Sequence, residues 1–190
     1  MLTVTLVLLL GANEFKKVDE VDGVTIESRS VPGSSFAELR FTTTTPKPVE
    51  ALCTEAFGTG KFDATEPDLK SREILSESAD ERTTYERMTP AVVSPRSYAL
   101  REKRTRVDGA CQIDFEAAND VAPPPEPGWV RVKLVHGSWR AEPLEGGKSR
   151  LTYVIFTDPA GAIPAFFVEG ARRKLGVTWV KRVVERAASH

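Results

Sequence analysis

The chain has 190 residues, a length at which one domain is the default and a sizeable core can be buried. Apolar residues make up 41% and charged residues 28%, which is typical of a globular protein. The formal net charge of -1 gives no overall field that attracts nucleic acid or an anionic membrane, so we expect no nucleic-acid partner. We interpret the basic cluster Arg172, Arg173 and Lys174 as a solvated helix face.

An uncharged apolar run, Leu2–Leu10, opens the chain and is followed by Gly11 and Ala12. It is too short to span a bilayer, which takes about 20 residues, but it fits the hydrophobic region of a secretory signal. We therefore predict a signal peptide over residues 1–12, a mature domain over 13–190, and a secreted or periplasmic location. The alternative is an ordinary first β-strand in a cytoplasmic protein, since the Thr and Val residues of the run favour strands.

Alternation of apolar and polar residues predicts strands over Val24–Arg29 and Phe36–Thr44, joined as a hairpin. Thr45-Pro46 then offers an N-cap followed by proline at the first helical position. A helix of about three turns is expected from there, and Gly58 ends it.

The rest of the chain is rich in strand-like runs separated by turn residues, among them Asp108-Gly109. The expected strands are Ser71–Ser78, Glu81–Met88, Tyr98–Val107, Cys111–Ala118, Gly128–Trp139 and Ser149–Thr157. Because the strands follow one another directly, the connections are hairpins and the sheet is antiparallel.

A connector, Asp158–Pro164, leads to a long terminal helix that we expect to begin near Ala162. About 25 residues at 1.5 Å each give a rod of roughly 38 Å. Its apolar stripe consists of Ile163, Phe166, Phe167, Gly170, Val177, Val180 and Val184. Gly170 and Gly176 each cost about 1 kcal/mol relative to Ala, and they indicate either close packing or a kink. The predicted fold is α+β, a curved antiparallel sheet wrapped around the long C-terminal helix.

Four stretches, which follow one another along the chain in the order given below, resemble the START family (steroidogenic acute regulatory protein-related lipid transfer domains), in particular its bacterial single-domain members. Asp22–Arg29, followed by Val31–Ser34, is similar to the family's first strand and turn, and Val93–Leu100 to the pattern S-x-R-D-[FY]-V. Gly137–Leu144 is similar to the strand before the penultimate hairpin, and Thr157–Phe166 to the connector D-x-x-G-x-[IL]-P. The resemblance implies the helix-grip fold of the Bet v 1-like superfamily. It also implies a tunnel between sheet and last helix that holds one hydrophobic molecule, such as a sterol or a phospholipid.

Many START domains place an acid and an arginine on neighbouring strands inside this tunnel. Arg96 matches the arginine of the S-x-R-D pattern. Counted from there, the tunnel arginine position falls on Glu102 and the acid position falls near Thr83. The charge pair is therefore lost, swapped or shifted by a bulge. Strand alternation places Arg101 on the opposite face from Glu102.

The residues that the resemblance and the strand and helix patterns place at the ligand are Arg96, Tyr98, Leu100, Glu102, His136, Phe166, Phe167, Gly170 and Val177. His136 is either a polar contact in the pocket or an exposed strand histidine. With His190 as the only other histidine, the chain offers no histidine metal cluster. Asp114 and Glu116 share one face with the spacing of a solvated outer surface.

We therefore expect a lipid-binding monomer without a cofactor or catalytic residues, in transient contact with membranes, and we leave open whether it also transfers the lipid. The first alternative is an enzyme of the same superfamily, a polyketide aromatase/cyclase. The second is a domain with a filled core that binds a protein partner through an exposed apolar patch. Cys53 and Cys111 have no metal-site spacing. We expect two buried free thiols, although an exported chain could oxidise them.

Overall fold

The structure is a computed structural model that describes residues 14–58, 66, 68–90, 93–160 and 165–187. The predicted signal peptide over residues 1–12 lies outside these ranges. The elements are β1 (Lys16–Val21), β2 (Val24–Ser30), β3 (Ala37–Thr45), α1 (Val49–Phe57), β4 (Leu69–Glu77), β5 (Glu81–Met88), β6 (Arg96–Val107), β7 (Ala110–Ala117), β8 (Val130–Arg131), β9 (Leu134–Pro143), a short 3-10 turn (Glu145–Gly147), β10 (Ser149–Asp158) and α2 (Ala165–Arg186).

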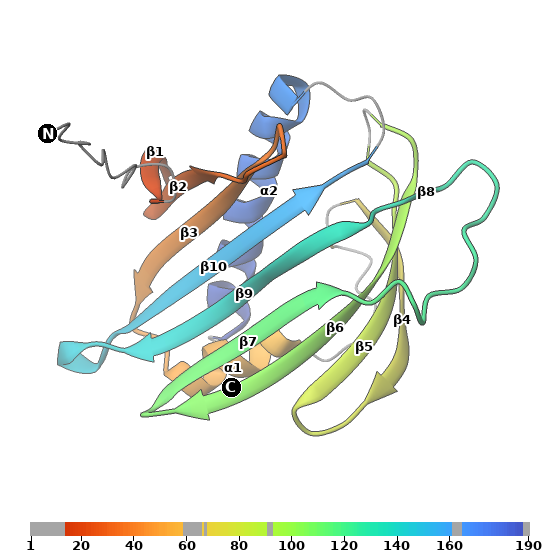
Figure 1. Cartoon of the computed structure of the whole chain (residues 1–190). Coiled ribbons are helices and arrows are strands. Elements are labelled where there is room, and N and C mark those ends of the chain that lie inside the picture. The colour runs from red at the N-terminus through yellow and green to blue at the C-terminus, as the bar shows by residue number, and fades with distance from the viewer. Residues whose placement is uncertain (1–13, 59–65, 67, 91–92, 161–164, 188–190) are drawn as a thin grey trace, which may run out of the picture.

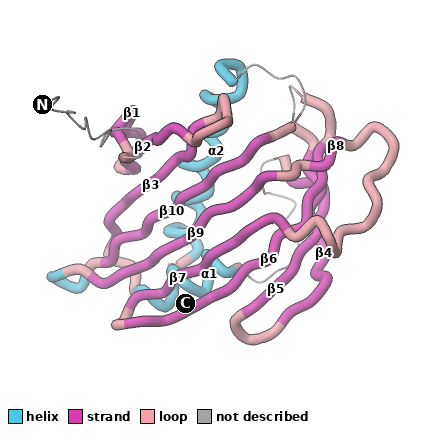
Figure 2. Tube along the Cα trace, in the orientation of Figure 1, coloured by secondary structure: helices cyan, strands magenta, loops and turns pink. Residues whose placement is uncertain are grey.

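One strongly curved sheet carries the fold, with strand order β1-β2-β3-β10-β9-β7-β6-β5-β4 (Figure 1). Neighbours in this order pair antiparallel, and β8 joins β6 in parallel. Both helices lie on the same side of the sheet (Figure 2). The predicted α+β helix-grip architecture is confirmed. In the described part of the chain, no helix is both long and apolar enough to cross a membrane.

The long helix α2 packs on the sheet through an apolar stripe. Val177, Val180, Val183 and Ala187 are buried in the main core, whereas Val184 is half-buried. Gly176 allows the closest approach, since a Cβ there would lie 2.1 Å from the Phe41 ring of β3. The sequence left open whether Gly170 and Gly176 permit close packing or mark a kink. At position 176, the glycine permits close packing.

Helix α1 closes one end of the fold and is joined covalently to the sheet. Cys53 forms a disulfide with Cys111 of β7, with Cα atoms 5.9 Å apart. The expectation of two free thiols was wrong, because sequence alone could not place α1 against β7 at bridging distance. The helix begins at Val49, later than the expected cap at Thr45. Thr45 is instead the last residue of β3, paired with Ser149 of β10.

The stretch expected as one strand over Gly128–Trp139 is divided. β8 pairs with β6, after which the chain changes partners and β9 pairs with β7 and β10. Asn119 holds the switch by donating from Nδ2 to the Val132 carbonyl at 2.7 Å. The interruption changes which residues of the following strand face inward.

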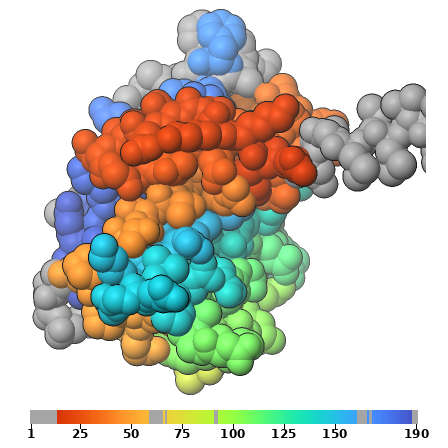
Figure 3. All heavy atoms as spheres, turned by 90° about the vertical axis from the view of Figure 1, so that its left-hand side faces the viewer, coloured from red at the N-terminus to blue at the C-terminus, as the bar shows by residue number. Residues whose placement is uncertain are grey.

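β1 was not predicted, because all six of its residues are exposed and mostly polar. It pairs with β2 across a tight turn at Asp22 and Gly23, both with positive φ. Figure 3 shows these strands (red) side by side with α2 (blue) on the surface, where Lys181 Nζ lies 2.7 Å from Asp22 Oδ2. This ion pair ties the turn to the long helix.

Candidate functional site

A cavity of about 520 Å³ lies between the concave face of the sheet and the two helices. Its volume falls within the range of roughly 300–1,000 Å³ found for pockets that enclose a drug-sized molecule. Its apolar wall includes Leu69, Leu100, Phe115, Val132, Val135, Trp139, Tyr153, Ile155, Val168, Leu175, Trp179 and Val183. Strands β4, β6, β7, β9 and β10 and helix α2 contribute to this wall, and Val132 lies between β8 and β9.

Aromatic side chains form part of the cavity wall next to α2. Trp139 of β9 and Tyr153 of β10 are stacked with ring centroids 4.0 Å apart, and Tyr153 also stacks on Phe41 at 5.8 Å. Burial raises the pKa of the Tyr153 hydroxyl. The phenol therefore stays protonated and uncharged at neutral pH.

Many of the polar groups of the wall are inward-facing residues of β5 and β6, and these residues lie opposite each other in pairs. The register places Arg82 opposite Glu102, Glu86 opposite Tyr98, and Met88 opposite Arg96. We call the end at Arg82 and Glu102, next to α1, the helix end. The end at Arg96, next to residues Pro159 and Ala160 that follow β10, is called the connector end.

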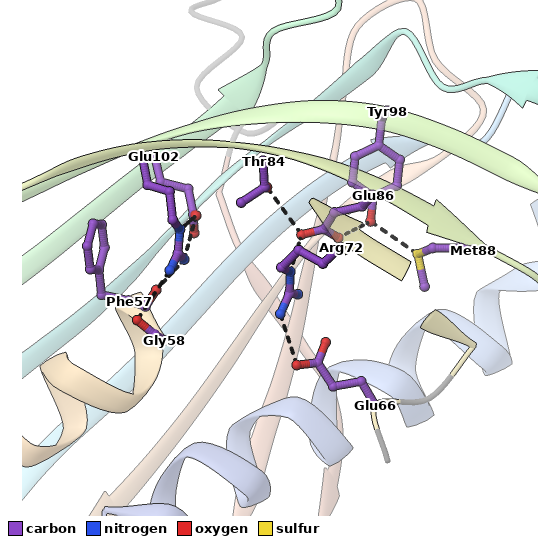
Figure 4. A network of polar contacts seen from close by, with 10 residues as sticks. Phe57, Gly58, Glu66, Arg72, Thr84, Glu86, Met88, Tyr98 and Glu102 are labelled. Atoms are coloured by element: carbon purple, nitrogen blue, oxygen red, sulfur yellow. Dashed lines mark hydrogen bonds and ion pairs between the residues drawn. The ribbon is translucent and has the colours of Figure 1, made fainter. Parts of the chain in front are cut away.

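At the helix end, Arg82 and Glu102 form a buried ion pair, with Nη2 of Arg82 2.6 Å from Oε2 of Glu102. The same guanidinium donates to the carbonyls of Phe57 and Gly58 at the C-terminus of α1 (Figure 4). Arg82 therefore supplies hydrogen bonds to carbonyls at the C-terminus of α1 that have no partner within the helix. Burial raises the pKa of the Glu102 carboxyl in spite of the opposing effect of Arg82.

In the middle of the cavity, Arg72 of β4 bridges two carboxylates (Figure 4). Its Nε donates to Glu86 Oε1 at 2.8 Å and its Nη1 to Glu66 Oε1 at 2.9 Å. Although burial lowers the pKa of Arg72, Glu86 and Glu66 raise it more, so the net pKa lies above the ordinary value. The Tyr98 hydroxyl donates to Glu86 Oε2 at 3.1 Å and lies 3.1 Å from Met88 Sδ.

At the connector end, Arg96 is 6% exposed, and its acceptors among the described residues are all backbone carbonyls. Its acceptors are Ser94, Pro159 at 3.4 Å and Ala160 at 3.4 Å. Burial lowers the pKa of its guanidinium. Ala160 has a positive φ of 57°, so Arg96 holds an unusual backbone conformation just before α2.

Four of the nine predicted ligand residues lie on the cavity wall, namely Arg96, Tyr98, Leu100 and Glu102. They are alternate residues of β6, as its strand pattern predicted, and Arg101 faces away, 3.8 Å from Asp120. Asp114 and Glu116 are exposed, as predicted for an outer face. The ligand role of the four residues stays a prediction.

His136 is not on the wall, which corrects its assignment to the pocket. Its side chain is 52% exposed, with Nε2 3.5 Å from Glu38 Oε1. The reason is the interruption between β8 and β9, after which Val135 rather than His136 faces the cavity.

Three predicted residues of α2 were also assigned wrongly to the cavity wall. Phe166 is 74% exposed, Gly170 is exposed, and Val177 is buried in the core against the sheet. The side chain of Phe167 lies outside the described residues. Conversely, Arg172 was expected to be solvated but reaches the wall and donates to the Ala37 carbonyl at 2.9 Å.

Sequence reasoning missed Arg72, Arg82 and Glu86 as wall residues. Arg82 and Glu86 could have been found because they are four residues apart in the predicted strand Glu81–Met88 and therefore share one face of it. Of the three possibilities for the charge pair, the structure shows the swap, with the arginine on β5 and the acid on β6. Among the described residues, no cluster of three or more His, Cys, Asp or Glu side chains could hold a metal ion.

Comparison with known proteins agrees with this architecture. An uncharacterized protein of Pseudomonas aeruginosa is 26% identical over 159 residues, which cover 82% of this chain and 77% of that protein. A STAR-related lipid transfer protein from Xanthomonas axonopodis has a similar structure, with a TM-score of 0.80, 20% identity, and coverage of 92% of this chain and 98% of that one. The Zhui aromatase/cyclase from Streptomyces sp. R1128 is similar with a TM-score of 0.58 and 17% identity, over 80% of this chain and 93% of that one.

The two structural matches are below 25% identity and speak for the fold alone. The profile of the START domain matches residues 69–188, which is more than half of the chain and includes every strand from β4 to β10 and all of α2. The chain therefore belongs to the START domain family.

Proposed function

We propose that the protein binds one lipid-type molecule in the cavity between sheet and α2 and carries it without chemical change. The observation that carries the proposal is the cavity itself, a space of about 520 Å³ whose wall is mainly apolar. At about 25 cal/mol per Å², burying some 400 Å² of apolar ligand surface contributes on the order of 10 kcal/mol before ordering costs. That amount suffices for tight binding without any reactive group.

The direct experiment is native mass spectrometry of freshly purified protein, followed by extraction and identification of the bound lipid. A co-purifying lipid supports the proposal. A clean mass of the protein alone, with no binding of added sterols or fatty acids, contradicts it.

A pair of variants locates the binding site. Leu100→Trp places a larger side chain into the cavity, whereas Leu134→Trp places the same side chain at a position that is 55% exposed. We expect the first variant to lose ligand binding with its circular dichroism unchanged, and the second to bind normally. Equal binding by both variants would place the ligand elsewhere.

The second candidate is an enzyme of the aromatase/cyclase kind. The observation in its favour is Glu102, a buried carboxyl whose raised pKa keeps it closer to the protonated form that a general acid needs. Against this role, Arg82 already occupies the carboxyl. The test is product analysis after incubation with a linear polyketide thioester: a cyclised product that disappears in Glu102→Gln favours the enzyme.

We propose further that the protein is exported. The apolar run Leu2–Leu10 supports a signal peptide, and the disulfide between Cys53 and Cys111 is the kind of bond that persists in oxidising compartments. Cell fractionation with N-terminal sequencing tests this. A cytoplasmic chain that retains Met1 would contradict it.

The expected monomeric state and the transient membrane contact also remain proposals. Light scattering after gel filtration tests the first, and flotation with liposomes tests the second. A stable dimer, or failure to extract lipid from liposomes, would count against a monomeric transfer protein.

A further inference from the structure

Arg96 is a buried cation, and no acidic side chain of the described residues balances its charge. Its residue is 6% exposed, yet no carboxylate of the described residues lies within 4.0 Å of its nitrogens. The undescribed segments 91–92 and 161–164, which lie close to it along the chain or follow Ala160, contain no acidic residue. Buried charges in proteins are normally paired, because an isolated charge is costly to remove from water.

Other arginines of the cavity wall meet this requirement. Arg72 pairs with two glutamates, Arg82 pairs with Glu102, and Arg172 has its Nη1 2.9 Å from Glu169 Oε2. Arg96 differs from these three arginines. Arg72, Arg82 and Arg172 each have an acidic partner, whereas Arg96 at the connector end has none among the described residues.

The hydrogen bonds of Arg96 leave room for an anion. A guanidinium has five N–H donors, and three of them point at neutral carbonyl oxygens, those of Pro159 and Ala160 at the long distance of 3.4 Å. Two donors, one on each terminal nitrogen, have no acceptor among the described residues. Arg96 is also on the cavity wall, two residues along β6 from Tyr98, so a ligand in the cavity can reach it.

We propose that Arg96 binds an anionic group of the ligand, so that the cavity takes an amphiphile with a carboxylate or a phosphate at its connector end. This inference rests on the proposed function, since it presumes a ligand in the cavity. The apolar part of the ligand lies against Leu100 and the aromatic pair Trp139 and Tyr153. The anion replaces the long contacts of the guanidinium with charge-assisted hydrogen bonds, which are shorter and stronger.

The experiment compares head groups on one chain. Displacement of Nile red, an uncharged dye, is measured with dodecanoate, dodecyl phosphate and dodecanol, and with inorganic phosphate alone. We expect the two anionic amphiphiles to bind about tenfold tighter than the alcohol, or more, which is the usual effect of a hydrogen bond to a charged group. Inorganic phosphate is expected not to displace the dye.

Variants assign this preference to the residue. Arg96→Gln should bring the affinities for dodecanoate and dodecanol together, and Arg96→Lys should keep part of the difference because it keeps the charge. Arg101→Gln removes a cation from the outward face of the same strand and should leave the preference intact.

The outcomes separate this inference from the proposed function. Equal affinity of the wild-type protein for dodecanol and both anions overturns the role of Arg96 while leaving lipid binding in place. Binding of none of the amphiphiles overturns both. Displacement by inorganic phosphate alone at the same concentration shows a free anion site and overturns the assignment to an amphiphile. The comparison of wild-type affinities stands even if Arg96→Gln fails to fold.

Discussion

The ion pair at the helix end allows the sharpest test of how the cavity is built. Arg82→Met removes the partner of Glu102 and, with it, the donors to the carbonyls of Phe57 and Gly58. Breaking a buried pair by removing one member costs about 3–5 kcal/mol. Since domains of this kind are stable by only about 5–15 kcal/mol, the variant should lose a large part of its free energy of unfolding.

The assay is urea denaturation followed by circular dichroism at neutral pH. Arg101→Met is the matched control, because Arg101 lies on the same pair of strands but is 48% exposed and 3.8 Å from its acid. That variant should change the free energy of unfolding by less than about 0.5 kcal/mol. A loss below about 1 kcal/mol in Arg82→Met would refute the idea that this arginine fastens α1 to the sheet.

The pH dependence gives a second test of the same site. Burial raises the pKa of Glu102 above its ordinary value of 4.5. A carboxyl with a raised folded-state pKa contributes stability that is fully present below the unfolded value and is lost as the pH rises through the folded value. The free energy of unfolding of the wild type, relative to Glu102→Gln, should therefore fall between about pH 4 and the folded-state pKa and then level off. A rise over this interval would mean that Arg82 outweighs burial.

Two further predictions concern packing around the helices. Reducing the disulfide between Cys53 and Cys111, which are separated by 58 residues, should cost about 4 kcal/mol on the chain-entropy estimate, measured by urea denaturation with and without reductant; coincident curves would contradict this. Gly176→Ala should destabilise by about 1–3 kcal/mol because the new methyl group meets Phe41. Gly170→Ala, at an open position, should stabilise by up to about 1 kcal/mol, and thermal unfolding that ranks the two variants in the opposite order would rule out the close-packing argument.

Local patterns predicted most of the strands because their signals lie within a few residues. Alternation gave Val24–Arg29 and Glu81–Met88 nearly to the residue, and Asp108-Gly109 marked the turn between β6 and β7, with both residues at positive φ. The long helix was evident from its apolar stripe. These features depend on backbone and side-chain periodicity, which a sequence displays directly.

The pairing of distant residues could not be predicted in the same way. The connection between β5 and β6 is too long for turn geometry to set the register, so the acid position was counted to Thr83 although the structure pairs Arg82 with Glu102. The disulfide also depends on how α1 lies against β7. His136 was misplaced for a related reason, since the change of strand partners after β8 reverses which residues face inward.

The swap of the charge pair has a consequence for ligand recognition. Arg82 donates hydrogen bonds to Glu102 and to the carbonyls at the C-terminus of α1. The ion pair at the helix end of the cavity therefore has a structural role. Arg72 uses Nε and Nη1 for its two glutamates, and its Nη2 makes no hydrogen bond with a described residue. Arg72 of β4 and Arg96 of β6 therefore both have N–H donors that no described residue accepts. Glu86 and Tyr98, beside Arg72, lie about 7 Å along the strands from Arg96, at two residues' rise. We therefore expect polar groups of the proposed ligand to be recognised in the middle and at the connector end of the cavity rather than at the helix end.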